Sequence, residues 1–110
     1  MIDWKRVEEL RDEIGEDDFN EVVALFLDET DEVAMNLRND MAHGAIESAL
    51  HFLKGSALNL GFTELAALCQ AGEKAAAQGH AATVDLGLVL DSYNRSKHAF
   101  EQGKAKMDAA

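Results

Sequence analysis

Apolar residues recur every three or four positions along almost the entire chain, which is the spacing of one face of an α-helix. No stretch alternates between apolar and polar residues as a half-buried β-strand does. The pattern therefore predicts five helices, a short first one and four longer ones. They cover residues 3–14, 18 to about 43–44, 45–60, 63–78 and 82–102.

The predicted helix ends carry residues that commonly stand there. Asp3 can cap the first helix, and Asp18 followed by Glu21 has the spacing of a capping box for the second. Glycine tolerates a left-handed backbone and so readily ends a helix, and it follows three of the predicted segments. These glycines are Gly15, Gly61 and Gly79.

Each helix carries an apolar stripe that must be buried against another helix. The clearest stripe, on the second helix, runs through Phe19, Val22, Val23, Phe26, Leu27, Thr30, Val33, Ala34, Leu37 and Met41. Four such helices joined by short turns favour an antiparallel arrangement. We therefore expect an all-α fold, an antiparallel up-down four-helix bundle with a short additional N-terminal helix. Residues 1–110 would form one domain that frays over about 103–110.

The composition agrees with a folded helical domain and narrows its partners. The chain has 110 residues, of which 47% are hydrophobic, and it has no proline, so long helices can run uninterrupted. Its formal net charge is −11. This charge disfavours nucleic acids and anionic membrane surfaces, because both bind proteins through lysine and arginine. We expect neither among its partners.

Cysteine usage and the first residues indicate where the protein works. Cys69 is the single cysteine, so no internal disulfide can form, and its apolar neighbours predict a buried structural thiol. The opening segment MIDWKRVEEL lacks the apolar core of a signal peptide, and no apolar run is long enough to span a bilayer. We expect a soluble cytoplasmic protein that is free-standing rather than part of a larger kinase.

One outward face of the predicted third helix combines groups suited to nucleophilic chemistry. Glu47, His51, Lys54, Gly55 and Leu58 are spaced by three and four on the side opposite the apolar stripe. A neutral imidazole is a good nucleophile, and a lysine one turn away can offset phosphate charge. A mid-helix glycine costs roughly 1 kcal/mol relative to alanine, which is reasonable where another surface must approach the backbone. Leu58 would add an apolar docking patch.

This face allows two other interpretations, a metal site and a non-catalytic interaction module. A metal-binding bundle would place Glu-x-x-His pairs inside two helices, whereas Glu47 and His51 face outward and His98 with Glu101 has no matching pair. We therefore expect no metal site. A non-catalytic interaction module would bind a partner protein through this face without transferring any group to it, and it would tolerate the substitution His51→Gln.

The segment from His51 to Gly61 reads HFLKGSALNLG. It closely resembles the signature of histidine-containing phosphotransfer (HPt) domains, H-x-L-K-G-S-[SA]-x-x-[LV]-G, with the histidine, lysine, two glycines and serine in register. Beyond the motif the similarity rests on chain length, helix order and the apolar pattern that follows Phe62. The resemblance implies a four-helix bundle whose exposed histidine accepts a phosphoryl group on Nε2.

The resemblance also implies roles for the neighbouring residues. His51 would be the phosphoacceptor, Lys54 would steady the phosphoryl oxygens, and Gly55 would let the partner approach closely. The partner-binding surface would include Leu58 together with Glu47 and Ser48.

Two further residues would support the site from behind. Ser56 matches the motif but lies five residues from the histidine, so we expect packing or local hydrogen bonding there. Several family members carry a glutamine near the phosphate on the next helix, and the matching position here is Glu73. A carboxylate pointing inward at that position would repel phosphate, so either Glu73 turns outward or His51 holds its phosphoryl group less firmly.

The implied activity is that of a phosphocarrier rather than a kinase. The chain has no Walker-type or glycine-rich nucleotide loop. The partners implied are response regulator receiver domains and a hybrid sensor histidine kinase. We expect no bound cofactor, Mg²⁺ carried by the partner receiver domain, and a monomer.

Overall fold

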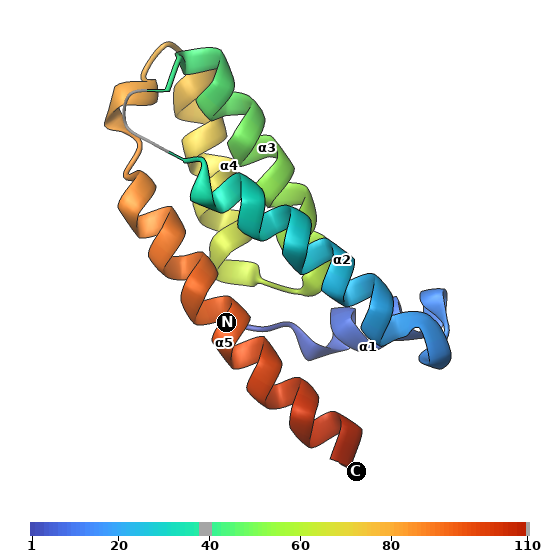
Figure 1. Cartoon of the computed structure of the whole chain (residues 1–110). Helices are drawn as coiled ribbons and strands as arrows, with labels where there is room; N and C mark the ends of the chain where they lie inside the picture. The colour runs from blue at the N-terminus through green and yellow to red at the C-terminus, as the bar shows by residue number, and fades with distance from the viewer. Residues whose placement is uncertain (38–40, 110) are drawn as a thin grey trace.

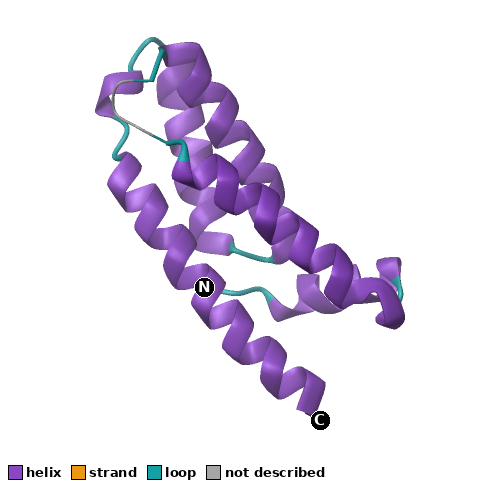
Figure 2. Cartoon of the chain, in the orientation of Figure 1, coloured by secondary structure: helices purple, strands orange, loops and turns teal. Residues whose placement is uncertain are grey.

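Every regular element in the described part of the chain is a helix. The computed structural model describes residues 1–37 and 41–109, and its helices are joined by short loops (Figure 2). The elements are α1 (Trp4–Ile14), α2 (Glu16–Met35), α3 (His43–Leu60), α4 (Thr63–Ala77), the short 3₁₀ helix η1 (Ala81–Thr83) and α5 (Leu86–Ala109). The all-α prediction is confirmed. Within the described residues, extended pairing is limited to an isolated bridge between Ile2 and Phe62.

Both ends of α1 form as the sequence predicts. The Asp3 side chain accepts a hydrogen bond from the Arg6 backbone N–H at 3.3 Å, which satisfies one of the unpaired donors of the first turn. At the other end, the Gly15 N–H donates to the Arg11 carbonyl, and Gly15 takes a φ of +100°, which favours glycine. This glycine lets α2 begin directly after α1.

The start of α2 differs from the prediction. The helix begins at Glu16, and Asp18 lies within its first turn instead of capping it. The Gly15 carbonyl accepts hydrogen bonds from the N–H groups of Asp18 and Phe19, so the backbone rather than a side chain starts the helix. Three acidic residues in the first turn favour this start through the helix dipole. The capping-box prediction is therefore wrong.

The end of α2 lies at Met35 rather than near residues 43–44. Leu37 and Met41 continue the apolar spacing of the helix, but they pack against the core from the connecting segment. The same periodicity therefore serves a loop here, and the prediction of one continuous helix is wrong. Residues 38–40, which the prediction assigned to the helix, lie outside the described residues.

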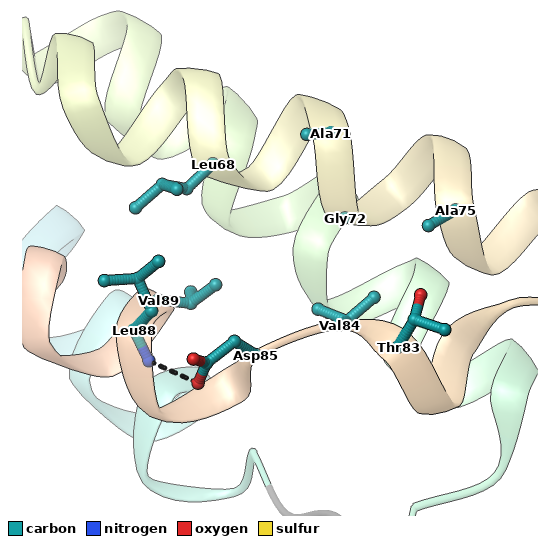
Figure 3. A pocket seen from close by; sticks show the side chains of 9 residues that line it. All are labelled: Leu68, Ala71, Gly72, Ala75, Thr83, Val84, Asp85, Leu88 and Val89. Atoms are coloured by element: carbon teal, nitrogen blue, oxygen red, sulfur yellow. Dashed lines mark hydrogen bonds between the residues drawn. The ribbon is translucent and has the colours of Figure 1, made fainter.

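The segment before α5 packs closely on α4. The Asp85 carboxylate accepts a hydrogen bond from the Leu88 N–H at 3.0 Å, as a helix cap does (Figure 3). This cap explains why α5 begins at Leu86 and not near residue 82. A Cβ atom on Gly72 of α4 would lie only 3.2 Å from Cγ1 of Val84. Because Gly72 has no side chain, Val84 can lie close to the backbone of α4.

The last helix continues to Ala109, beyond the predicted end near Gln102, and its C-terminal part extends past α3 and α4 (Figure 1). The Trp4 ring stacks on Phe100 with ring centroids 5.9 Å apart. A Cβ atom on Gly103 would overlap the Trp4 ring, so this glycine provides the space that the ring fills. Contacts from α1 thus hold the final helix.

α3 and α4 lie side by side and share the most extensive contact of any two elements in the described residues (Figure 1). Their inward stripes join those of the other helices in one core. Its largest fully buried side chains include Phe19, Leu50, Leu53, Leu60, Phe62, Leu65, Tyr93 and Phe100. Each such burial contributes about 1.5–3 kcal/mol. No helix in the described part of the chain has the length and apolar character needed to cross a membrane.

Candidate functional site

His51, Lys54 and Glu73 meet where α3 packs against α4. His51 and Lys54 are about one helical turn apart on α3, and Glu73 reaches both from α4. Oε1 of Glu73 lies 2.9 Å from Nδ1 of His51, and Oε2 lies 2.9 Å from Nζ of Lys54. One carboxylate therefore holds both the candidate phosphoacceptor and the lysine expected to bind phosphate.

The charge state of Glu73 follows from its two partners. The hydrogen bond from Lys54, and then the one from His51, lowers the pKa of Glu73 from its ordinary value of 4.5, against an opposing effect of desolvation. An ionised carboxylate accepts hydrogen bonds and donates none. Nδ1 of His51 must therefore carry the proton in the 2.9 Å contact with Glu73.

This proton decides which ring nitrogen can react. A neutral imidazole carries one proton, so a proton on Nδ1 leaves the lone pair on Nε2. The His51 side chain is 70% exposed, and no described residue forms a hydrogen bond with its Nε2. Nε2 is therefore an open, nucleophilic nitrogen at the protein surface.

The surface of α3 beside His51 is open as well. A Cβ atom on Gly55 would have no packing neighbour within 4 Å, so this glycine is not required by the internal packing of the protein. Leu58 is 58% exposed and Phe52 is 38% exposed. Exposed apolar side chains of this kind are typical of docking surfaces. Phe52 was not among the residues predicted from the sequence, although its place next to the histidine and off the buried stripe could have indicated it.

Two open hollows flank the Glu73 carboxylate. The hollow next to the imidazole is lined by Gly44, Glu47, Ser48, His51 and Glu73. The hollow next to the lysine is lined by Glu47, Lys54, Gln70, Glu73, Lys74 and Ala77. The structure thus brings Glu47 and Ser48 to the histidine. It also adds Gln70 and Lys74 of α4, which no motif in the sequence indicated.

Two residues lie behind the reactive groups. Ser56 is buried on the inner side of α3, so its side chain faces the core. Cys69, one turn before Glu73 on α4, is completely buried, and burial together with the Glu73 charge raises the pKa of its thiol to about 12. The thiol is therefore protonated and unreactive at neutral pH.

The groups at the site suit phosphoryl transfer. They comprise a nucleophilic nitrogen, an ammonium group and a carboxylate that orients both, and phosphoryl transfer depends on positioning and charge neutralisation of this kind. Across the described residues, no three His, Cys, Asp or Glu side chains are grouped so that they could hold a metal ion.

Comparison with known proteins places the chain in a family. Searches of curated proteins and of solved structures found no match. The family model of the Hpt domain matches residues 21–102, which is most of the chain and includes α3, α4 and all three site residues. Hpt domains act in phosphorelays with receiver domains and kinases, so a general role in histidine phosphotransfer is supported. The chain therefore belongs to the Hpt domain family.

Proposed function

We propose that this protein is a cytoplasmic histidine phosphocarrier of a two-component phosphorelay. His51 accepts a phosphoryl group from the aspartyl phosphate of a receiver domain, or from a hybrid sensor histidine kinase, and passes it to another receiver. The observation that carries this proposal is the contact between Nδ1 of His51 and Glu73, because it leaves Nε2 exposed with its lone pair available.

The transfer step follows from this arrangement. The lone pair on Nε2 of His51 forms the N–P bond while the P–O bond to the donor carboxylate breaks, and that electron pair leaves with the donor oxygen. Lys54 is 22% exposed and lies next to the imidazole, so its ammonium group can neutralise charge on the phosphoryl oxygens. The receiver supplies the aspartate and its Mg²⁺.

The docking surface surrounds the nucleophile. Gly55 lets the partner reach the imidazole without a steric barrier, and the exposed Leu58 provides apolar contact area. Glu47 and Ser48, in the hollow beside the histidine, complete the surface on the N-terminal side of α3. We expect a monomer to present it.

We further infer the bundle topology that carries this surface. α2 to α5 form an antiparallel up-down four-helix bundle, and α1 is an addition at one end. The short connections between successive helices favour this arrangement. The chain forms one domain over residues 1–110.

Phosphotransfer from a receiver domain tests the proposal. A receiver is charged with acetyl phosphate in the presence of Mg²⁺ and mixed with the wild type, His51→Gln or His98→Gln. His98 is an exposed histidine on α5 and serves as the matched control. An acid-labile, base-stable label is expected on the wild type and on His98→Gln.

The outcome separates a phosphocarrier from an interaction module. A label that persists in His51→Gln would mean that another residue accepts the phosphoryl group. If the receiver binds the wild type but labels none of the three proteins, the module binds receivers without carrying phosphate.

A further inference from the structure

We propose that Glu73 keeps a proton on Nδ1 of His51 after the phosphoryl group has been transferred, so that the phosphorylated ring is an imidazolium that gives up its phosphoryl group readily. This inference rests on the proposed phosphocarrier function. It assigns to Glu73 a role as a positioning residue that shortens the life of the phosphorylated state.

In the resting protein, the proton already lies on Nδ1 of His51. Nδ1 of His51 donates its proton to Oε1 of Glu73 at 2.9 Å, and Glu73 is only 21% exposed, so the contact is shielded on one side. Attack on phosphorus uses only the lone pair of Nε2. The Nδ1 proton does not take part, and it stays in its hydrogen bond while the N–P bond forms.

The Nδ1 proton sets the charge of the phosphorylated ring. A ring that carries a proton on Nδ1 and a phosphoryl group on Nε2 is positively charged, whereas loss of that proton would leave a lone pair on Nδ1. That lone pair would face an anionic oxygen at 2.9 Å, which is repulsive. The carboxylate therefore retains the proton, and a neutral glutamine at this position could not act as a counter-ion for the ring.

The other charged groups described around the ring make no contact with Nδ1. On α3, Lys54 pairs with the second oxygen of Glu73, and Glu47 lines the same hollow as the ring. On α4, Lys74 lines the neighbouring hollow beside Lys54, and the buried Cys69 thiol is protonated. Among these groups, Glu73 is the one that contacts Nδ1.

The protonated ring is the better leaving group. When the N–P bond of an imidazolium breaks, the electron pair returns to Nε2 and yields a neutral imidazole that still carries its Nδ1 proton. The deprotonated ring would instead leave as an imidazolate, which is far less stable. Glu73 therefore favours donation of the phosphoryl group to a receiver over its storage on His51.

Decay of the phosphorylated protein without any receiver tests this inference. The full chain is phosphorylated with phosphoramidate, freed of reagent and followed by ³¹P NMR at pH 8 and at pH 5. The variant is Glu73→Gln, and the charge-matched control is Glu8→Gln, because Glu8 is exposed on α1. ¹⁵N spectra of the histidine rings report directly on the Nδ1 proton.

We expect Glu73→Gln to retain its phosphoryl group roughly tenfold longer than the wild type at pH 8, the change that one unit of proton affinity produces. At pH 5 the two lifetimes should converge, because both rings are then protonated. Phosphorylated wild type should show a protonated Nδ1 at pH 8, and Glu8→Gln should behave like it.

Two results would overturn the inference. If His51 is phosphorylated and the wild type and Glu73→Gln decay equally fast at pH 8, the function stands and the role of Glu73 fails. A deprotonated Nδ1 in the phosphorylated wild type at pH 8 would likewise show that Glu73 does not retain the proton, and this result requires no variant. If His51 takes up no phosphoryl group at all, the proposed function fails and the inference fails with it.

Discussion

Two carboxylates hold pairs of side chains from a neighbouring helix, one at the candidate site and one at the seam between α2 and α5. Glu73 of α4 lies between His51 and Lys54 of α3. Asp31 of α2 accepts hydrogen bonds from the Tyr93 hydroxyl and from Nζ of Lys97, both on α5, the latter at 2.9 Å.

The two clusters differ in the exposure of the ring that contacts the carboxylate, which is Tyr93 at Asp31 and His51 at Glu73. Tyr93 is 2% exposed, and burial, followed by its hydrogen bond to Asp31, raises the pKa of the phenol, so its proton is fixed. His51 is 70% exposed and keeps one ring nitrogen open to solvent. We therefore expect the carboxylate to stabilise the fold where its partner is buried and, under the proposed function, to prepare a nucleophile where its partner is exposed.

Removing each carboxylate should separate the two roles most clearly. Glu73→Ala is expected to slow phosphoryl acceptance from a receiver roughly tenfold, equivalent to about 1.4 kcal/mol, because the ring loses both its fixed tautomer and its counter-ion. Asp31→Ala is expected to cost about 1–3 kcal/mol of unfolding free energy, because the buried Tyr93 hydroxyl loses its main acceptor.

Phosphotransfer kinetics and urea unfolding, measured on both variants, check this separation. The Asp31 variant should transfer at the wild-type rate, and the Glu73 variant should unfold close to the wild-type midpoint. A loss of transfer in the Asp31 variant would contradict the assignment of that cluster to stability.

Each carboxylate also pairs with a lysine, Lys54 at Glu73 and Lys97 at Asp31, and the two lysines should differ in the same way. Lys54→Gln should slow transfer about tenfold. A hydrogen bond to a charged group contributes about 1.5–3 kcal/mol, and the partly exposed Lys54 is expected at the lower end of this range. Lys97→Gln should leave transfer unchanged and lower stability by less than about 1 kcal/mol, because the Asp31–Lys97 pair is partly exposed. Rates from receiver-transfer assays decide between these expectations, and equal rates in wild type and Lys54→Gln would exclude phosphate stabilisation by Lys54.

The sequence predicted the parts of the site that lie on one helix. His51, Lys54 and Gly55 are fixed relative to one another by helical spacing and by the motif that contains them. The contacts of Glu73 depend on how α3 and α4 are aligned and on its side-chain conformation, which no spacing within one helix determines. The sequence could therefore name Glu73 but not its partners.

The fold shows the same limit. Burial of the predicted stripes needed only local periodicity, and Leu50, Leu53 and Leu60 of α3 are buried as expected. The packing of Trp4 against Gly103 joins residues from opposite ends of the chain, so no local pattern indicated it. The end of α2 at Met35 was missed because Leu37 keeps the helical spacing while belonging to the loop.

The open face of α3 offers a smaller test. Gly55→Gln adds a side chain to a surface without neighbours, so the fold should be stabilised by about 0.5–1 kcal/mol through better helix propensity. Docking of a receiver should be hindered, while direct phosphorylation by phosphoramidate should be unchanged. Normal transfer from a receiver in this variant would remove the argument that the glycine permits close approach.

The smallest expected effect concerns pH and the Asp31 cluster. Burial raises the pKa of Asp31, but the hydrogen bonds from Lys97 and Tyr93 outweigh it, and the pKa lies below its ordinary value of 3.8. A carboxyl group whose pKa is lowered by folding stabilises the protein above its unfolded pKa, and this contribution disappears as the pH falls through the folded pKa. The melting temperature of the wild type should therefore decrease as the pH drops below about 4. The decrease should be less steep in Asp31→Asn. Parallel pH profiles of the two proteins would contradict a stabilising role of the ionised Asp31.

Identifying the nitrogen that carries the phosphoryl group tests the proposed mechanism most directly. Long-range ¹H–¹⁵N spectra are recorded on the full chain after transfer from an acetyl-phosphate-charged receiver with Mg²⁺. We expect phosphorus bonded to Nε2 of His51 alone, with the proton on Nδ1. A phosphoryl group on Nδ1 of His51, or on another histidine, would contradict it.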